Sequence, residues 1–412
     1  MTPAPQPSDT HPSDTPAVSP APALTGALTL AMAAACGIAV ANIYYNQPML
    51  GILEREFAGS VLTGFVPTAT QLGYAAGLLL LVPLGDLVDR RRLIVMQLLA
   101  IGVMLALAAV APSAAWLVVA SLFIGVLSTV AQQIVPLAAT LAAPHKRGHV
   151  IGMVMSGLLC GVLFSRTLGG FVATHHGWRS MFWLAVPLAW GTAALMAATL
   201  PRHAPASTLR YREALASLAQ LWRHRPALRA AALTQGALFA SFSAFWTVLA
   251  LRLEQPVFNL GADVAGLFGV IGAAGVVAAP IAGRLADRRG PHLVVGLGTV
   301  VTLLSWLLFG SWANVWAMVA GVIILDFGMQ GALVSNQAIV FALDPQARSR
   351  LNTVFMGSMF LGGAVGSAAA TAAWKVGQWP AVCTLGGGLA VLAFAIQALL
   401  TLRRRRVART GG

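Results

Sequence analysis

The sequence predicts an all-α integral membrane protein with twelve transmembrane helices arranged in two six-helix halves. The first reason is composition: 58% of the 412 residues are hydrophobic and only 9% are charged, whereas soluble domains carry about 25% charged residues. The second reason is a series of long apolar runs, and the third is an internal repeat. The composition excludes a soluble enzyme, a disordered chain and a nucleic-acid-binding domain.

Twelve apolar runs are long enough to cross a bilayer, which takes about 20 helical residues. We expect helices because a lone strand leaves its backbone groups unsatisfied in lipid. The runs also lack the alternation that is typical of barrel strands. The predicted spans are 23–45, 61–84, 93–111, 114–138, 150–173, 179–200, 229–251, 264–283, 292–311, 315–341, 353–374 and 380–402.

Polar segments divide these spans into two groups of six. Residues 1–22 are rich in Pro, Ser and Thr and contain no Lys or Arg, a pattern that is typical of a disordered tail. Within the central polar stretch, residues 211–225 predict either an amphipathic helix on the membrane surface or a plain solvated linker. The predicted division is a tail at 1–22, a bundle at 23–200, a basic linker at 201–228, a bundle at 229–402 and a basic tail at 403–412.

The basic residues predict the orientation in the membrane. If both termini lie in the cytoplasm, 21 of the 26 Lys and Arg residues fall on the cytoplasmic side, four fall outside, and Arg166 lies inside a span. Cytoplasmic loops carry such an excess of positive charge. The net charge of +14 therefore indicates topology and contact with lipid headgroups, not nucleic acid. We expect a multi-pass protein of the cell inner (plasma) membrane, with both termini cytoplasmic.

A short motif repeats between the halves. Residues 85–90 read Gly-Asp-Leu-Val-Asp-Arg, and residues 283–288 read Gly-Arg-Leu-Ala-Asp-Arg, at an offset of 198 residues. Parallel repeats of this kind surround a central pathway in membrane proteins. The acids lie at helix ends, where they can pair with helix termini and basic groups across the halves and so act as a gate; the alternative is a topology signal alone. The motif residues are Gly85, Asp89, Arg90, Gly283, Asp287 and Arg288.

These two segments resemble the cytoplasmic signature of the major facilitator superfamily. Two further stretches, Ala-Asn-Ile-Tyr-Tyr-Asn-Gln-Pro at 41–48 and Asp-Pro-x-x-Arg-x-Arg-x-Asn at 344–352, resemble its bacterial drug-efflux-type branch of proton antiporters, whose members include purine-nucleoside and sugar exporters. The resemblance implies the major facilitator fold, alternating access, a small-molecule substrate and a gating role for the repeated motif.

Asp326 is the one acidic residue that lies deep in a predicted span. It is about eleven residues from the outer end, near the bilayer centre at 1.5 Å per residue. An ionised carboxylate is costly there, so Asp326 is a candidate for binding and releasing a proton in each cycle. Gln330 and Gln337 extend the same polar stripe. The alternative is that Asp326 only hydrogen-bonds a neighbouring helix.

Arg166 is the one basic residue inside a span. The glycines around it, Gly157, Gly161, Gly169 and Gly170, resemble the glycine-rich antiporter motif of drug exporters and permit close helix packing. We expect Arg166 to meet an anionic substrate or an acid and to take part in proton coupling. The alternative is that its side chain reaches the outer headgroups.

Polar and aromatic residues in several spans predict a cavity for a neutral, hydrogen-bonding, partly flat molecule. For any one of these residues the alternative is a hydrogen bond between helices. The predicted cavity residues are Asn42, Tyr45, Asn46, Gln71, Tyr74, Gln132, Gln133 and Trp246, with Gln330 and Gln337.

The function that these features favour is secondary active transport, with proton-coupled efflux of a small organic compound as the leading hypothesis. Uptake by proton symport or uniport is one alternative, and a membrane sensor that no longer transports is another. The sequence shows no nucleophile–base set and no metal-ligand cluster, so we expect neither an enzyme nor a cofactor or metal. The expected partners are a small-molecule substrate, protons and membrane lipids, with no nucleic acid, and we expect a monomer.

The charge distribution predicts where labels become accessible. Cysteines at Arg210 and at the C-terminus should react only from the cytoplasm, and cysteines at Ser113 and Gly377 only from outside. The measurement is labelling of whole cells by a membrane-impermeant maleimide, in a parent without the native Cys36, Cys160 and Cys383. Labelling at residue 210 from outside would overturn this topology.

Overall fold

The computed structural model describes residues 25–201, 210–344 and 346–410. The predicted tail 1–22 lies outside these residues, as do positions 202–209 of the predicted linker and the last two residues. Within the described ranges, the regular elements are all helices, as the sequence predicts.

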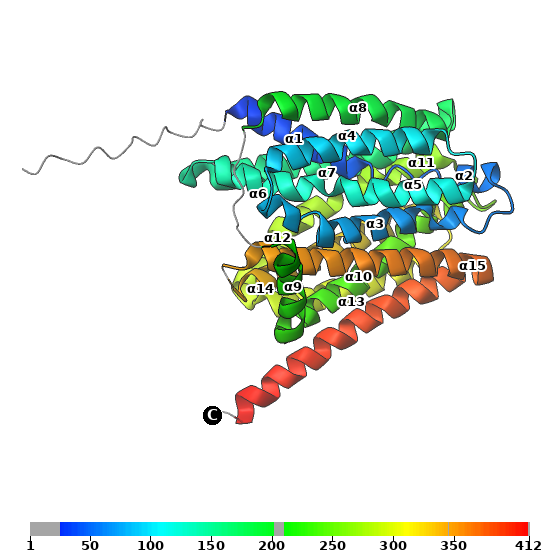
Figure 1. Cartoon of the computed structure of the whole chain (residues 1–412). Helices are drawn as coiled ribbons and strands as arrows, with labels where there is room; N and C mark the ends of the chain where they lie inside the picture. The colour runs from blue at the N-terminus through cyan, green and yellow to red at the C-terminus, as the bar shows by residue number, and fades with distance from the viewer. Residues whose placement is uncertain (1–24, 202–209, 345, 411–412) are drawn as a thin grey trace, which may run out of the picture.

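The N-terminal half consists of helices that run back and forth between the two ends of a bundle (Figure 1). Three of its spans contain short 3-10 turns or breaks. Its elements are α1 (Gly26–Ala41), α2 (Leu50–Glu56), η1 (Thr63–Phe65), α3 (Val66–Leu80), η2 (Pro83–Asp86), α4 (Arg90–Ala109), α5 (Ala114–Leu127), η3 (Ser128–Val130), α6 (Ala131–Leu141), η4 (Pro144–Lys146), α7 (Arg147–His176) and α8 (Trp178–Thr199).

The C-terminal half follows the helix α9 and has one broken and one merged span. The chain is non-helical at Gly377 and Gln378, where α15 folds back, so α15 contains two spans. The elements are α9 (Tyr211–His224), α10 (Pro226–Leu253), α11 (Ala262–Ile271), α12 (Ala274–Arg289), α13 (Pro291–Ser311), α14 (Val315–Phe341) and α15 (Arg348–Thr410).

The number of crossings agrees with the sequence. Nine helical segments in the described ranges are long and apolar enough to span a membrane. The 16-residue α1 is shorter, the α11–α12 span is interrupted, and α15 supplies two crossings. Counting these gives the predicted twelve. The basic 403–410 segment continues the helix α15.

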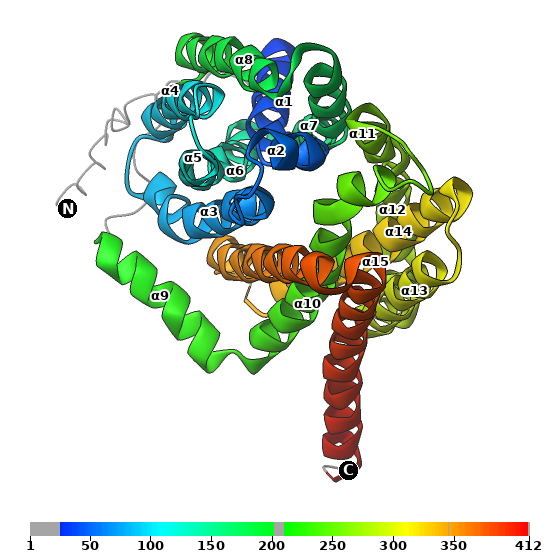
Figure 2. The same ribbon diagram turned by 90° about the vertical axis from the view of Figure 1, so that its right-hand side faces the viewer.

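The two halves lie side by side, and α9 crosses one end of the bundle between them. Figure 2 shows α1 and α3–α8 grouped on one side, α10–α15 on the other, and α9 running beside α3 and α10. The Tyr211 hydroxyl donates to the Leu80 carbonyl at 2.8 Å, and Arg225 pairs with Asp344 at 3.5 Å. The end that carries α9 is called the linker end below, and the opposite end the α2 end.

Glycines allow helices within each half to approach closely. A Cβ built on Gly161 of α7 would overlap the backbone of Gly37 in α1, and a Cβ on Gly362 of α15 would overlap the backbone of Gly236 in α10. Close backbone approach of this kind strengthens helix packing in membranes, where the hydrophobic effect does not drive helices together.

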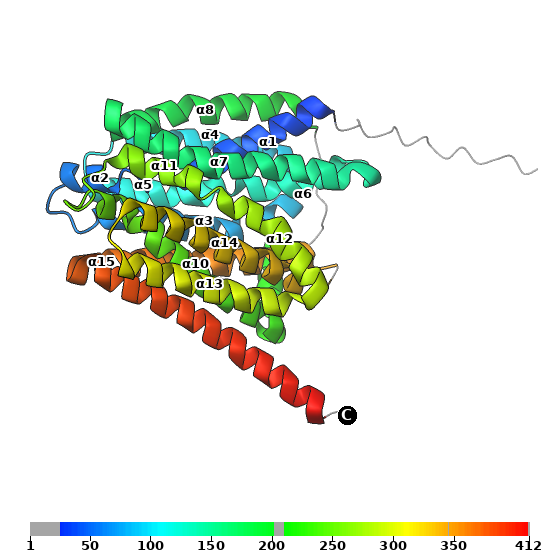
Figure 3. The same cartoon turned by 180° about the vertical axis from the view of Figure 1, so that it is seen from behind.

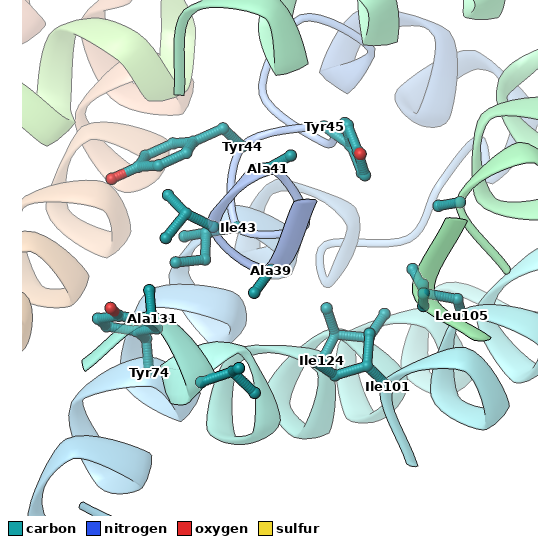
Figure 4. Packing of buried hydrophobic residues seen from close by; sticks show 14 of the residues in the cluster. Ala39, Ala41, Ile43, Tyr44, Tyr45, Tyr74, Ile101, Leu105, Ile124 and Ala131 are labelled. Atoms are coloured by element: carbon teal, nitrogen blue, oxygen red, sulfur yellow. The ribbon is translucent and has the colours of Figure 1, made fainter. Parts of the chain in front are cut away.

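The buried apolar core continues across the boundary between the halves. The largest cluster, part of which Figure 4 shows, lies in the N-terminal half and includes Phe239 and Phe360 of the C-terminal half. The Tyr74 ring lies 4.4 Å from the Phe360 ring, and Phe360 lies 5.0 Å from Phe239, measured between ring centres. This aromatic group joins the halves near α3.

At the α2 end the halves are in close contact. The Thr371 hydroxyl donates to the Gly64 carbonyl at 2.9 Å, and the Thr68 hydroxyl donates to Ser367 Oγ at 2.9 Å. Both hydrogen bonds join α15 to the start of the span that contains α3. The α2 end is therefore closed in this structure.

Toward the linker end, α7 and the α11–α12 span separate. The helix α7 packs closely on α11, whereas α12 bends away from it (Figure 3). Positions Gly152 of α7 and Gly283 of α12 have no atom within 4 Å of a built Cβ. With the predicted topology, the structure is closed to the outside and more open toward the cytoplasm.

The contact between α1 and α7 predicts an effect on stability. Gly161→Val should lower the stability by about 1–3 kcal/mol, because its side chain overpacks a backbone contact. Purified protein should lose at least about 3 °C in Tm, measured by tryptophan fluorescence. The control is Gly152→Val on the same helix, which should leave Tm unchanged; equal Tm values for both variants would contradict the packing.

Candidate functional site

Three side chains hold Arg166 of α7 at the boundary between the halves. Its residue exposure is 3%. Its Nε donates to Gln47 Oε1 at 2.9 Å, and its guanidinium carbon lies 4.6 Å from the Tyr44 ring centre and 4.0 Å from that of Trp246. Cation–π contacts are strongest where water is excluded. The two terminal nitrogens have no hydrogen-bond partner among the described residues.

Asp326 of α14 is the buried acid opposite this arginine. It is 7% exposed, and its Oδ2 has no hydrogen-bond partner in the described part of the chain. No ion pair within 4.0 Å joins it to Arg166 in the described ranges, although the two charges are near enough to interact. A buried carboxylate without a hydrogen bond is costly. Asp326 therefore has a strong physical reason to bind a proton or a ligand donor.

Two glycines of the interrupted α11–α12 span bring Arg166 and Asp326 to one site. A Cβ on Gly269 would lie 2.9 Å from Cβ of Arg166. A Cβ on Gly272 would lie 3.4 Å from each carboxylate oxygen of Asp326 and 3.3 Å from Cζ2 of Trp246. A side chain at Gly269 would overlap Arg166, whereas a Cβ at Gly272 would be in close van der Waals contact with Trp246 and Asp326.

The site combines hydrogen-bond donors and an acceptor that the protein leaves unpaired. Asp326 Oδ2 and Trp246 Nε1 are both buried without a partner among the described residues, and the terminal nitrogens of Arg166 form no hydrogen bond with these residues either. Buried polar atoms normally have partners. A small molecule with a flat face and both donor and acceptor atoms can satisfy all three groups.

The turn after α1 decides which tyrosine reaches this site. The Asn42 amide donates to the carbonyls of Ile38 at 2.9 Å and Ala39 at 3.3 Å, so it satisfies the end of α1, and residues 42–49 leave the helix. Tyr44 and Tyr45 then point to opposite sides (Figure 4). Tyr44 contacts Arg166, whereas the predicted cavity residue Tyr45 is buried away from it.

Two of the predicted cavity residues, Gln71 and Tyr74, lie on α3. The Ser243 hydroxyl donates to Gln71 Oε1 at 3.0 Å across the halves. The Gln132 amide donates to the Tyr74 hydroxyl at 3.3 Å within the N-terminal half. Only the first of these bonds has to change when the halves move relative to each other.

Other predicted cavity residues make contacts within one half. The Asn46 amide donates to Thr70 Oγ1 at 2.8 Å, and the Gln133 amide donates to Gln97 Oε1 at 2.7 Å. Gln133 thus joins α6 to α4 and serves helix packing. Asn42 Oδ1, Asn46 Oδ1 and Gln133 Oε1 have no partner among the described residues.

Gln330 and Gln337 follow Asp326 along α14. A Cβ on Gly275 would lie 3.1 Å from Cγ of Gln330 and 3.1 Å from Cβ of Asp326, so Gln330 adjoins the site. Gln337 lies further along α14, where its amide lies 3.8 Å from the sulfur of Met356. The polar stripe therefore extends from the acid toward the linker end.

The first copy of the repeated motif forms a compact turn within the N-terminal half. Arg90 donates from Nε to the Gly85 carbonyl at 2.9 Å and from Nη2 to Asp86 Oδ1 at 2.6 Å. Asp89 caps α4 by accepting from the Arg91 backbone N–H at 2.8 Å. In this conformation Asp89 binds the helix end of its own half.

The second copy has a different backbone. Gly283, Asp287 and Arg288 lie in the last turns of α12, which ends at Gly290 with a φ of +87°. Asp287 and Arg288 are exposed. The repeat in sequence thus corresponds to a 3-10 turn in one half and to a continuous helix in the other.

Comparison with known proteins identifies the family. The model of the Major Facilitator Superfamily matches residues 28–293 and 231–411. The chain belongs to the Major Facilitator Superfamily. It is 43% identical, over 90% of its length and 94% of the relative, to the uncharacterized transporter YgaY of Escherichia coli O157:H7. It is 26% identical to the multidrug resistance protein B homolog of Mycobacterium tuberculosis (strain CDC 1551 / Oshkosh), over 82% of its own length and 75% of the relative.

A solved structure has the same fold. The bacterial homolog of the human lysosomal transporter Spinster, in an inward-facing and occupied conformation, superimposes with a TM-score of 0.72 at 13% identity, covering 91% of this chain and 96% of that one. The protein is therefore a multi-pass membrane transporter of the superfamily with the two-half fold, and the family implies a small-molecule substrate.

The sequence indicated the two charged residues of this superfamily member but not all their neighbours. Tyr44 and Gln47 lie in the 41–48 motif and were not among the predicted site residues. The glycines at 266, 269, 272 and 275 recur every third residue and form the face of α11–α12 that meets Arg166 and Asp326. That three-residue spacing is a signal in the sequence from which the contribution of α11–α12 to the site could have been predicted.

The repeated motif predicts a rate effect. Asp89→Asn should fold and insert normally, because asparagine also caps helices, but should slow transport severalfold, because it removes the charge available for pairing across the halves. Asp287→Asn should act in the same direction and less strongly. The readout is substrate-dependent proton movement in proteoliposomes, with melting curves as the control for folding. Normal rates in both variants would show that the motifs act as topology signals alone.

Proposed function

We propose that this transporter exports a small organic compound in exchange for protons by alternating access, with Asp326 as the coupling site. The observation that carries the proposal is the buried carboxylate oxygen of Asp326 without a hydrogen-bond partner among the described residues. Arg166 does not neutralise it by direct contact, because Gln47, Tyr44 and Trp246 hold the guanidinium. The acid is thus free to bind a proton or a substrate.

Competition at this acid gives antiport. An ionised Asp326 accepts a hydrogen bond from a neutral substrate, and protonation of Asp326 weakens that acceptor. Substrate and proton then occupy the site in turn, so they cross the membrane in opposite directions. The aromatic face of Trp246 and the amides around it suit a flat, neutral, hydrogen-bonding compound. The name of the multidrug resistance relative also supports export.

The free terminal nitrogens of Arg166 favour a second candidate, uptake of an organic anion by proton symport. A guanidinium binds carboxylates through two parallel hydrogen bonds. An anion on Arg166 competes with the charge of Asp326, so it binds best when Asp326 is protonated, and the two then move together. The direction of proton movement on substrate addition separates the candidates: export in exchange moves protons opposite to the substrate.

The coupling role of Asp326 predicts the behaviour of Asp326→Asn in liposomes. The variant imitates the protonated acid, so accumulation driven by a pH gradient should be abolished. Substrate exchange should continue only at a higher substrate concentration, because the asparagine carbonyl oxygen is a weaker acceptor than the carboxylate. Labelled purine nucleosides and disaccharides are suitable neutral probes, with an internal pH dye to record proton movement. Undiminished accumulation would remove Asp326 as the coupling site.

Asp263→Asn is the matched control for this experiment. Asp263 lies in the first turn of α11 at the α2 end, so the substitution removes the same charge outside the site. This variant should accumulate probes like the parent protein. Loss of accumulation in both variants would point to a general effect of removing acids.

A further inference from the structure

We propose that Glu54 of α2 is a second proton site, which takes up a proton from the outer side each time the α2 end closes. The inference rests on the proposed alternating-access cycle and on the predicted topology. It concerns a different acid, at a different depth, from Asp326.

The short helix α2 belongs to the N-terminal half and packs against the C-terminal half. Arg55 Nη1 pairs with Glu254 Oε2 at 2.6 Å, with side-chain exposures of 64% and 22%. The carboxylate of Glu254 lies where a Cβ of Gly51 would be, so only glycine lets this acid lie on α2. Glu254 follows the end of α10. The contact therefore forms only when the α2 end is closed.

Glu54 enters the same boundary without a direct partner. It is half-buried, and no hydrogen bond or ion pair reaches its carboxyl group among the described residues. The charged groups that face it are Lys375 of α15 and Glu254, which is already bound to Arg55. Lys375 in turn donates to the Val61 carbonyl at 3.2 Å, so its charge is held at this boundary.

Burial raises the pKa of Glu54 above its ordinary value, Lys375 lowers that pKa, and the like charge of Glu254 raises it. Glu254 and Lys375 both belong to the other half, and burial, the largest of the three effects, outweighs the lowering by Lys375 in the closed state. When the α2 end opens, water returns and Glu254 and Lys375 both move away; the loss of burial, the largest effect, then brings the pKa back toward about 4.3.

The sign of the linkage follows from this difference. A group whose pKa is higher in the closed state binds a proton on closing. The closed state therefore gains stability that is fully present below the pKa of the open state, and this stability is lost as pH rises through the pKa of the closed state. A proton from the outer side thus favours closure, which is the step that resets an exporter after it releases its substrate outside.

The distance between the halves at the α2 end tests this inference. Spin labels at Ala58 of the N-terminal half and Val257 of the C-terminal half occupy exposed positions on either side of the boundary. The parent lacks the three native cysteines and carries Asp326→Asn, so that the central acid does not contribute. Pulsed EPR in nanodiscs, without any substrate, then gives the closed and open fractions.

Between about pH 8 and about pH 5, the closed-to-open ratio of the parent should rise by about threefold or more. Glu54→Gln, which imitates the protonated acid, should be as closed at both pH values as the parent is at the lower one. A pH response in Glu54→Gln equal to that of the parent, or a parent without a response, would overturn the proposal.

Two further variants separate titration from packing. Glu56→Gln removes a neighbouring acid that pairs with Arg179 inside the N-terminal half at 2.6 Å, and it should keep the full response. Lys375→Met should move the midpoint of the response to higher pH, because the positive charge that favours ionised Glu54 is gone. If Lys375 only supports packing, the closed fraction changes at every pH and the midpoint stays; that result would overturn the electrostatic argument.

This test and the test of Asp326 fail independently. The EPR response needs neither substrate nor a functional central acid, so loss of coupling through Asp326 leaves it readable. Conversely, a transporter whose Glu54 does not titrate still requires Asp326 for accumulation.

Discussion

The burial of a basic and an acidic side chain, Arg166 and Asp326, at the boundary between the two halves is the constraint on which this structure depends. In lipid, an unpaired charge or polar atom is costly, and charged residues within spans face the interior of the bundle. Arg166 obtains partners from the turn after α1 and from α10, through Gln47, Tyr44 and Trp246. Asp326 obtains no hydrogen bond at Oδ2 among the described residues. The arrangement thus keeps one charge held and leaves the other able to exchange.

The helices are in close contact at the α2 end and diverge toward the linker end. Glycine positions account for the close contacts. At Gly170 the helix α7 meets the backbone of Ala262 in α11, and at Gly266 the helix α11 meets the backbone of α7. Further along, α12 bends away from α7. The α11–α12 break lies beside Asp326, so the point where the helix changes direction is also the point where the acid meets it.

The fold and the two charged residues were predictable because they depend on features that a single sequence displays: long apolar runs, an internal repeat, and one acid and one base where charges are rare. The neighbours were predictable only in part: Trp246 and Gln330 were among the predicted residues, whereas Tyr44 and Gln47 were not. Tyr45 was predicted on the assumption that the helix continues to residue 45, but the Asn42 amide ends α1 at Ala41, and the following turn presents Tyr44 instead. Gln133 follows the 3-10 turn η3, and its side-chain amide donates to Gln97 within the N-terminal half instead of facing the boundary between the halves. In both cases a local backbone change altered the direction of a side chain.

The charge of the site gives the proposed cycle an electrical consequence. With Asp326 ionised, the positive charge of Arg166 is compensated, and the step that carries a neutral substrate outward moves little net charge. With Asp326 protonated, the return step carries that positive charge uncompensated toward the cytoplasm. A membrane potential that is negative inside favours this movement by about 2.3 kcal/mol per elementary charge for each 100 mV across the full field. In the proposed cycle one proton enters for each neutral substrate that leaves, so the whole cycle moves one positive charge inward and the membrane potential drives it as well as the pH gradient. The fixed charge of Arg166 determines only that this charge moves in the return step.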